Sequence, residues 1–125
     1  MKKFLIFRTD RVGDFILSCI LINSIKRNKP NSEITVICSD QNYEYVKNYS
    51  LVDNAKLYPK KFIKKISFYY SMIKSDFDCI LSLDGKKRSI FACAISRAKL
   101  KIMTVTKKIY KNIFFNFKNN ILFIK

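Results

Sequence analysis

The stretch FLIFRTDRVGDFIL (residues 4–17) determines the fold that we expect for this chain. Four apolar residues precede a polar segment that contains Gly13, and a second apolar run follows it. An apolar run ending in a glycine-containing turn is typical of a buried strand, and the apolar run behind the turn predicts a helix. Strand, turn and helix form the first half of a βαβ unit. Because ligands of open α/β sheets bind at the carboxyl ends of the strands, Asp10, Gly13 and Asp14 lie where we expect the chemistry.

The same alternation of strand and helix patterns continues along the chain. Further strands are predicted at residues 33–38, 55–58, 77–83 and 100–103, and helices at residues 14–27, 41–48, 60–75 and 89–96. This alternation predicts an α/β fold, with a Rossmann-like parallel sheet and helices on both faces. The first helix is apolar on most sides, so we expect it to be mostly buried.

The helix predicted at residues 60–75 is amphipathic. Its apolar residues recur at helical spacing at Phe62, Ile63, Ile66, Tyr69, Tyr70 and Ile73, and lysines occupy the remaining face. We expect Phe62, Ile66 and Ile73 to pack on the sheet.

Length and composition suit one domain of 125 residues, because 49% hydrophobic residues can fill a modest core. The formal net charge of +16 is typical of proteins that bind a polyanion or an anionic lipid surface. Most of the basic residues are lysines dispersed through a chain rich in isoleucine and asparagine, so a compositional bias at the surface explains the charge as well. One hypothesis is therefore a non-catalytic binding module for an anionic polymer such as nucleic acid, although no RRM-type aromatic signature supports it.

The cysteines predict a reducing compartment rather than a metal site. The four cysteines lie far apart in or beside apolar segments, no C-x-x-C pair occurs, and the chain has no histidine, so a zinc site is not expected. Arg8 interrupts the first apolar run too early for an export signal, and the apolar run at residues 15–22 is too short to cross a bilayer. We expect a cytoplasmic protein with buried, reduced thiols.

Two predicted loops carry the candidate chemistry. The first, residues 8–14, contains neither a dinucleotide-binding glycine motif nor a Walker loop, which argues against nucleotide binding. Its Asp14 is either a helix N-cap or a functional carboxylate. The second loop, residues 84–89, combines an acid, a glycine and three consecutive cations beside a helix start, and is either a cradle for an anion or a solvated basic turn.

Three segments together resemble a known family. RTDRVGDFILS (residues 8–18), EITVIC (residues 33–38) and FDCILSLDGKKRS (residues 77–89) resemble glycosyltransferase family 9, the lipopolysaccharide heptosyltransferases. The resemblance covers residues 1–103 and implies the N-terminal, acceptor-binding half of a glycosyltransferase B architecture, in which a second Rossmann-like domain binds the ADP-sugar donor. Residues 104–125 are expected to be a tail that begins a truncated remainder.

The resemblance also implies roles for individual residues. The acid of the Gly-Asp turn in the family is the proposed general base, and this position falls on Asp14, with Asp10 as the fallback. The substrate-binding residues implied for an acceptor with carboxylates and phosphates are Asp10, Arg11, Gly13, Asp84, Gly85, Lys86, Lys87 and Arg88. No metal or other cofactor is expected, and the chain alone is expected to be inactive. The basic, aromatic helix at residues 60–75 would also suit contact with the inner membrane, where that acceptor is embedded.

Overall fold

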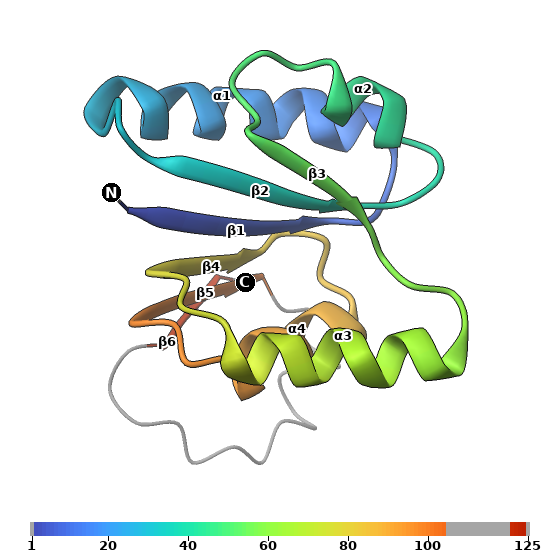
Figure 1. Cartoon of the computed structure of the whole chain (residues 1–125). Coiled ribbons are helices and arrows are strands. Elements are labelled where there is room, and N and C mark those ends of the chain that lie inside the picture. Colours follow the sequence, from blue (N-terminus) through green and yellow to red (C-terminus); the bar gives the residue numbers. More distant parts are fainter. Residues whose placement is uncertain (1, 105–120, 125) are drawn as a thin grey trace.

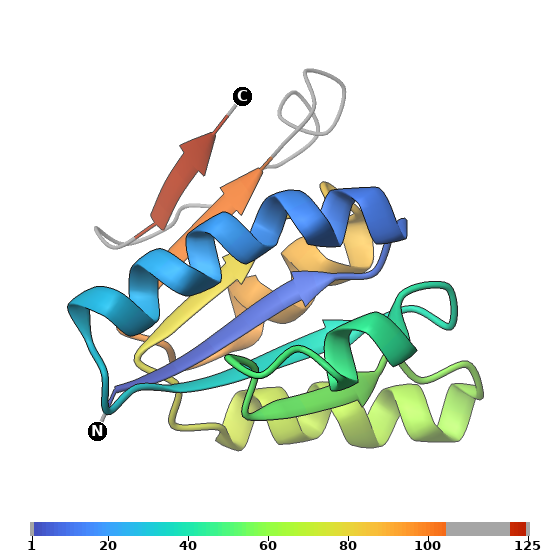
Figure 2. The same cartoon turned by 90° about the horizontal axis from the view of Figure 1, so that it is seen from above.

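The computed structural model of the chain describes residues 2–104 and 121–124, which form a parallel sheet covered by helices (Figure 1). The strands are β1 Lys3–Arg8, β2 Glu33–Cys38, β3 Asn54–Leu57, β4 Cys79–Ser82, β5 Leu100–Thr104 and β6 Ile121–Ile124. The helices are α1 Val12–Asn28, α2 Tyr43–Lys47, α3 Phe62–Lys74 and α4 Lys87–Ile95. The strand order is β3-β2-β1-β4-β5-β6, and every neighbouring pair is parallel. In Figure 2, β6 lies at one edge of this sheet. The predicted α/β fold class is confirmed.

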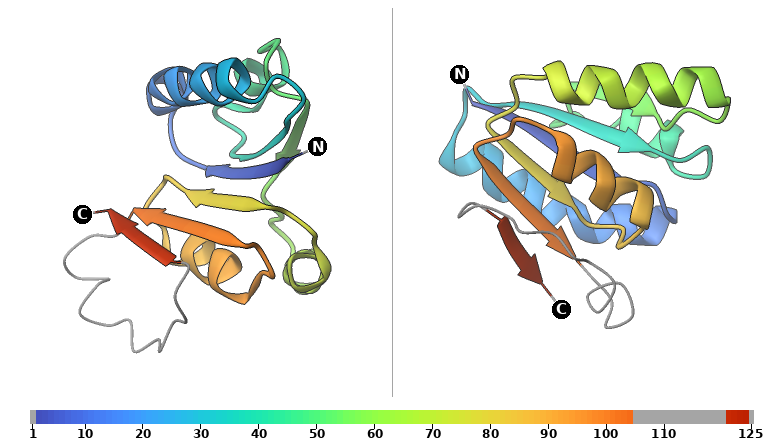
Figure 3. Two further views of the ribbon diagram at one scale, coloured as in Figure 1. Left: turned by 90° about the vertical axis from the view of Figure 1, so that its left-hand side faces the viewer. Right: turned by 90° about the horizontal axis from the view of Figure 1, so that it is seen from below.

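Successive side chains along a strand point to opposite faces of the sheet, and a hydrophobic core forms on each face. Leu5 and Phe7 of β1 join a cluster with α3 and α4, whereas Ile6 joins a cluster with α1 and α2. Figure 3 shows these two helical layers on opposite faces of the sheet. The central strands are therefore buried on both sides, which is why their sequences are continuous apolar runs.

The expectation that α1 is mostly buried is wrong. Its buried residues are Phe15, Ser18 and Ile22, whereas Ile16, Leu17 and Ile20 are 60–72% exposed. A helix on the outside of a single sheet contacts it through one stripe, so apolar residues on its other sides remain at the surface.

The expectation for α3 is also wrong, because the helix is rotated relative to the predicted packing. Phe62, Ile66 and Ile73 are exposed, and the sheet is contacted instead by Phe68, Tyr69 and Met72. Phe68 makes edge-to-face contacts with Phe7 and Tyr58, at ring-centroid distances of 6.2 and 5.5 Å. These aromatic contacts fix which side of the helix is buried.

The C-terminal segment contributes β6, which pairs with β5 through Lys101 opposite Ile121. Residues 121–124 thus continue the sheet, whereas residues 105–120 lie outside the described part of the chain. The division into a domain at residues 1–103 and a tail at 104–125 stays a prediction. Within the described residues, no helix combines the length and the apolar character needed to span a bilayer.

Candidate active site

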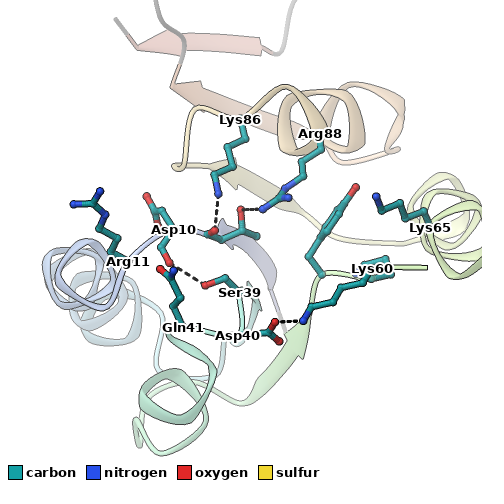
Figure 4. Close-up of a pocket in the computed structure, with 12 residues that line it drawn as sticks. Asp10, Arg11, Ser39, Asp40, Gln41, Lys60, Lys65, Lys86 and Arg88 are labelled. Atoms are coloured by element: carbon teal, nitrogen blue, oxygen red, sulfur yellow. Dashed lines mark hydrogen bonds and ion pairs between the residues drawn. The ribbon is translucent and has the colours of Figure 1, made fainter. Parts of the chain in front are cut away.

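A pocket of about 620 Å³ opens at the carboxyl ends of the first four strands (Figure 4). Its lining residues come from the segments after these strands and from α3: Thr9, Asp10, Arg11, Ser39, Asp40, Gln41, Tyr58, Pro59, Lys60, Lys65, Lys86 and Arg88. The neighbouring strands β1 and β4 are followed by helices on opposite faces, so the pocket includes the topological switch point of the sheet. Ligands of doubly wound α/β folds bind at this place.

Arg8, at the end of β1, holds two carboxylates together. Its Nε lies 3.3 Å from Oδ1 of Asp10, and its Nη2 lies 3.4 Å from Oδ1 of Asp14. Its Nη1 donates a hydrogen bond of 2.7 Å to the carbonyl oxygen of Leu83, which follows β4. The Arg8 side chain is only 12% exposed. One buried guanidinium therefore joins both candidate bases to the end of the neighbouring strand.

Asp14 is not a helix N-cap. α1 begins at Val12, with Arg11 in the N-cap position and no side-chain capping bond, and the Arg11 carbonyl accepts the N–H of Phe15 at 3.2 Å. Asp14 therefore lies inside the first turn, where its charge still interacts favourably with the helix dipole. Its side chain is 41% exposed and does not line the pocket. Of the two hypotheses for Asp14, the N-cap hypothesis is thus wrong.

Asp10 has a different environment. It lines the pocket, its side chain is 21% exposed, and its carbonyl oxygen accepts a hydrogen bond from Ser39 Oγ at 2.9 Å. Burial raises the pKa of Asp10, the negative charge of Asp14 raises it further, and Arg8 partly opposes both effects. Two carboxylates that share one cation thus differ in exposure, which is a common arrangement for groups with distinct acid–base roles.

Asp84 organises the second loop. Its Oδ2 accepts hydrogen bonds from Thr9 Oγ1, Ser89 Oγ and the Thr9 N–H at 2.5, 2.7 and 3.3 Å, and its Oδ1 accepts the Lys86 N–H at 3.1 Å. The carboxylate thus fastens this loop to Thr9, the residue after β1, and to the first turn of α4. Gly85 has a φ of +66°, a conformation that glycine adopts without steric cost. Asp84 and Gly85 shape the loop and do not line the pocket.

Two of the three cations in this loop point into the pocket. Lys86 Nζ donates to the Thr9 carbonyl oxygen at 2.8 Å, and Arg88 Nη2 donates to Thr9 Oγ1 at 3.0 Å. The Arg88 guanidinium also lies 4.5 Å from the ring centroid of Tyr58, a cation–π contact that orients it. Lys87 is exposed and, like Gly13, does not line the pocket. Among the predicted binding residues, the structure therefore brings Asp10, Arg11, Lys86 and Arg88 together.

Two tyrosines, Tyr58 and Tyr69, form a hydrogen-bonded pair next to Arg88. Tyr58 Oη and Tyr69 Oη are 2.6 Å apart, and Tyr69 Oη donates to the Arg88 carbonyl oxygen at 3.4 Å. Burial raises the pKa of Tyr69, so this hydroxyl stays protonated and remains available as a donor.

The pocket residues that follow β2 and β3 were not among the predicted site residues. These are Ser39, Asp40, Gln41, Tyr58, Pro59 and Lys60, together with Lys65 from α3. Figure 4 shows Lys60 and Asp40 on the side of the pocket opposite Lys86 and Arg88, and the two form an ion pair. The rule that placed the first loop at the carboxyl end of a strand also applies after residues 38 and 57, and would have found most of them.

The cysteines are not part of this site. Cys38, Cys79 and Cys93 are buried, Cys19 is half-buried, and all four are free thiols. Burial raises the pKa of Cys38 and Cys93 to about 12 and that of Cys79 to about 11, so these thiols are poor nucleophiles. Within residues 2–104 and 121–124, no group of three histidine, cysteine or acidic side chains is arranged to hold a metal ion.

Comparison with known proteins bears on the family resemblance and on the fold. No family model matches the chain. The chain is 27% identical over 124 residues to lipopolysaccharide heptosyltransferase 1 of Campylobacter coli, and the match covers 95% of the chain and 36% of that protein. The resemblance to glycosyltransferase family 9 is confirmed.

Two solved structures share the fold. A glycosyltransferase family 9 protein from Veillonella parvula DSM 2008 matches with a TM-score of 0.70 and 16% identity, over 99% of the chain and 36% of that structure. The ADP-heptose lipopolysaccharide heptosyltransferase II of E. coli matches with a TM-score of 0.68 and 16% identity, over 83% of the chain and 30% of that structure. The chain therefore spans about a third of the length of each of these three proteins.

Proposed function

We propose that this chain is the acceptor-side half of a glycosyltransferase of the heptosyltransferase family. In this proposal the enzyme transfers a sugar from an ADP-activated donor to a lipopolysaccharide core acceptor. The observation that carries the proposal is the carboxylate pair on Arg8, which lies at the switch point of the sheet beside a pocket rich in cations. The donor would bind a second domain outside these 125 residues, so we expect no transfer by the chain alone.

Asp14 is our candidate for the catalytic base. It would accept the proton of the acceptor hydroxyl while that oxygen bonds to the anomeric carbon of the donor, the bond from this carbon to the ADP oxygen breaks, and the configuration inverts. Arg8 Nη2 lies 3.4 Å from Asp14 Oδ1, and this ion pair would hold the carboxylate in place. Asp10, which is less exposed and lines the pocket, is the alternative base.

The pocket has the charge expected for an anionic acceptor. Its lining includes Arg11, Lys60, Lys65, Lys86 and Arg88, against two acids. Guanidinium and ammonium groups form strong charge-assisted hydrogen bonds with carboxylates and phosphates, which the inner core of a lipopolysaccharide carries. Closure of a second domain over the pocket would exclude water and bring acceptor and donor together. We propose that this enzyme works in the cytoplasm, with peripheral contact to the inner membrane.

A direct test of the acceptor role is a calorimetric titration of the full chain with a lipopolysaccharide inner-core oligosaccharide. We expect saturable binding, and we expect the double variant Lys86→Ala/Arg88→Ala to weaken it about tenfold or more, because two charged donors to the ligand are lost. The matched control is Lys29→Ala, which removes an exposed lysine beyond the C-terminus of α1 and should leave the affinity unchanged.

The net charge of +16 favours one other candidate, a binding module for an anionic polymer such as nucleic acid. This candidate predicts tight binding of duplex DNA or RNA at physiological salt, with an affinity that falls steeply as salt is added. Such binding, together with no affinity for the core oligosaccharide, would replace the acceptor role with this one.

A further inference from the structure

Thr9, the residue directly after β1, uses every polar group that it has. Its N–H and its hydroxyl both donate to Oδ2 of Asp84, and its carbonyl oxygen accepts from Lys86 Nζ at 2.8 Å. Its Oγ1 also accepts from Arg88 Nη2 at 3.0 Å, and the whole residue is only 2% exposed. Valine has the same branched shape without a hydroxyl group, so packing alone does not account for a threonine at this position.

The direction of these hydrogen bonds determines how Thr9 meets Arg88. A hydroxyl group has one proton to donate and a carboxylate only accepts, so the proton on Thr9 Oγ1 points to Asp84. The lone pairs of Oγ1 are then left for the guanidinium of Arg88. Asp84, Thr9 and Arg88 therefore form a chain of hydrogen bonds in which the role of each group is fixed.

Arg88 is held on two further sides. Its guanidinium lies over the ring of Tyr58, 4.5 Å from the centroid, and its backbone carbonyl oxygen accepts a hydrogen bond from the hydroxyl of Tyr69 at 3.4 Å. A free arginine side chain has several rotatable bonds, whose freedom is lost when it binds a ligand. Because these contacts order Arg88 in advance, less conformational entropy is lost on binding.

Thr9 also keeps two positive charges close together. Lys86 and Arg88 both donate to this one residue, and both line the pocket. Figure 4 shows their side chains extending side by side from the start of α4. Two cations at short range repel each other, whereas an anion between them attracts both. The arrangement therefore suits a single phosphate or carboxylate group, which accepts charge-assisted hydrogen bonds from both cations.

We propose that Thr9 is a positioning residue, which holds Arg88 beside Lys86 as a preformed subsite for one phosphate or carboxylate group. The proposal rests on the proposed function only for the claim that this group belongs to the acceptor. The Thr9 hydroxyl acts through Arg88 and does not contact the anion itself. The Thr9 carbonyl oxygen remains in every variant of this residue, so replacement of the side chain would release Arg88 and leave Lys86 in place.

An NMR titration of the full chain with inorganic phosphate, followed at the backbone N–H of Lys86, tests this role. We expect Thr9→Val to raise the dissociation constant about fivefold, because the hydrogen bond that orients Arg88 is lost. Thr9→Ser keeps the hydroxyl and should bind as wild type does. The matched control is Ser89→Ala, because Ser89 Oγ donates to the same oxygen of Asp84 at 2.7 Å but Ser89 does not line the pocket. Its affinity for phosphate should be unchanged.

A double-mutant cycle with Arg88→Ala separates the positioning of Arg88 from a general effect on the loop. If Thr9 acts through Arg88, Thr9→Val should cause no further loss of affinity in the Arg88→Ala background. Thermal melting establishes that each variant is folded before it is compared. NMR relaxation of the Arg88 Nε–H group in the ligand-free wild type tests the preformed subsite without any substitution, and we expect an order parameter of about 0.85, as for rigid groups.

Four results would each overturn the proposal: wild-type affinity in Thr9→Val, an equal loss in Ser89→Ala, an undiminished loss in the Arg88→Ala background, or no phosphate binding by the wild type. An order parameter below about 0.6 for Arg88 would overturn it as well. The same titration with the inner-core oligosaccharide tests the proposed function separately. If the expected pattern holds for phosphate and the oligosaccharide does not bind, the acceptor role fails and the role of Thr9 stands.

Discussion

At the scale of single residues, Arg8 explains how this site holds two acids close together. Without a cation between them, the negative charges of Asp10 and Asp14 would repel each other at this short separation. Arg8 contacts both acids and the end of β4, so the arrangement is fixed by the sheet itself and not by a loop. A rigid strand end of this kind is a suitable support for a catalytic carboxylate.

The raised pKa of Asp10 predicts how stability depends on pH. Below the ordinary pKa of 3.8, Asp10 is protonated in both the folded and the unfolded chain, so its ionisation does not change the free energy of unfolding. As the pH rises through this value towards the higher folded pKa, the unfolded chain ionises more readily and folding loses stability. We therefore expect Asp10→Asn to be more stable than wild type at pH 7, with an advantage that disappears as the pH falls to 3.8.

Urea unfolding of both proteins between pH 3.5 and pH 7 measures this difference, with Asp53→Asn as the contrasting control. The ion pair with Lys26 and the Ile34 N–H lower the pKa of Asp53, so this variant should lose stability at neutral pH instead of gaining it. A stability advantage of Asp10→Asn that is the same at every pH would contradict the account of Asp10.

At the scale of elements, Asp84 holds the second loop in place between β1, β4 and α4. Asp84→Ala removes the acceptor of four hydrogen bonds and leaves the hydroxyl groups of Thr9 and Ser89 without this partner. We expect a loss of roughly 2–4 kcal/mol in the free energy of unfolding, because several charge-assisted bonds at a half-buried site are lost together.

Urea unfolding measures this loss, and Ser89→Ala, which removes one of the four bonds, is the graded control with an expected loss of about 1 kcal/mol. If Asp84→Ala were as stable as wild type, Asp84 would not be the residue that positions this loop.

The elements also show what could be predicted from the sequence. The strands and the order of helices followed from apolar runs and turn residues, because burial on both faces leaves a clear pattern in a parallel sheet. The orientation of α3 did not follow, since apolar residues occupy two sides of this helix and the contacts of Phe68 with Phe7 and Tyr58 decide between them. The start of α1 was also missed, because a helix that begins without a capping side chain gives no sequence marker.

Only part of the candidate site could be predicted, because some of its residues meet through contacts between distant parts of the chain. The first and last loops contain charged residues beside glycine, which drew attention to Asp10, Arg11, Lys86 and Arg88. Tyr58 and Lys65 enter the same pocket through the packing of β3 and α3 against the sheet, and such a contact across the fold has no local pattern. The hydrogen bonds by which Asp84 holds its loop could not be predicted either. In the sequence, an aspartate that binds neighbouring groups of the protein looks the same as one that faces solvent.

At the scale of the whole molecule, the structure is a Rossmann-like unit with an open pocket at the carboxyl ends of its strands, and our proposal has a second domain close over this pocket. The chain spans about a third of the length of each of the three proteins compared above, whose names are those of a heptosyltransferase or a glycosyltransferase. If the pocket binds the acceptor, catalysis requires a donor site brought over it from outside these residues. The activity is then a property of the assembled pair of domains, and the Arg8 pair of carboxylates contributes the base.

The most direct test is sugar transfer by the chain combined with the donor domain of a heptosyltransferase, measured by mass spectrometry of a lipopolysaccharide core acceptor incubated with ADP-heptose. The account predicts no product with the chain alone, product with the two domains together, and a loss of at least about a hundredfold in rate for Asp14→Asn with folding intact. A collapse of the rate in Asp10→Asn alone would transfer the role of base to Asp10. Turnover by the chain alone, or unchanged turnover in both variants, would contradict the central claim.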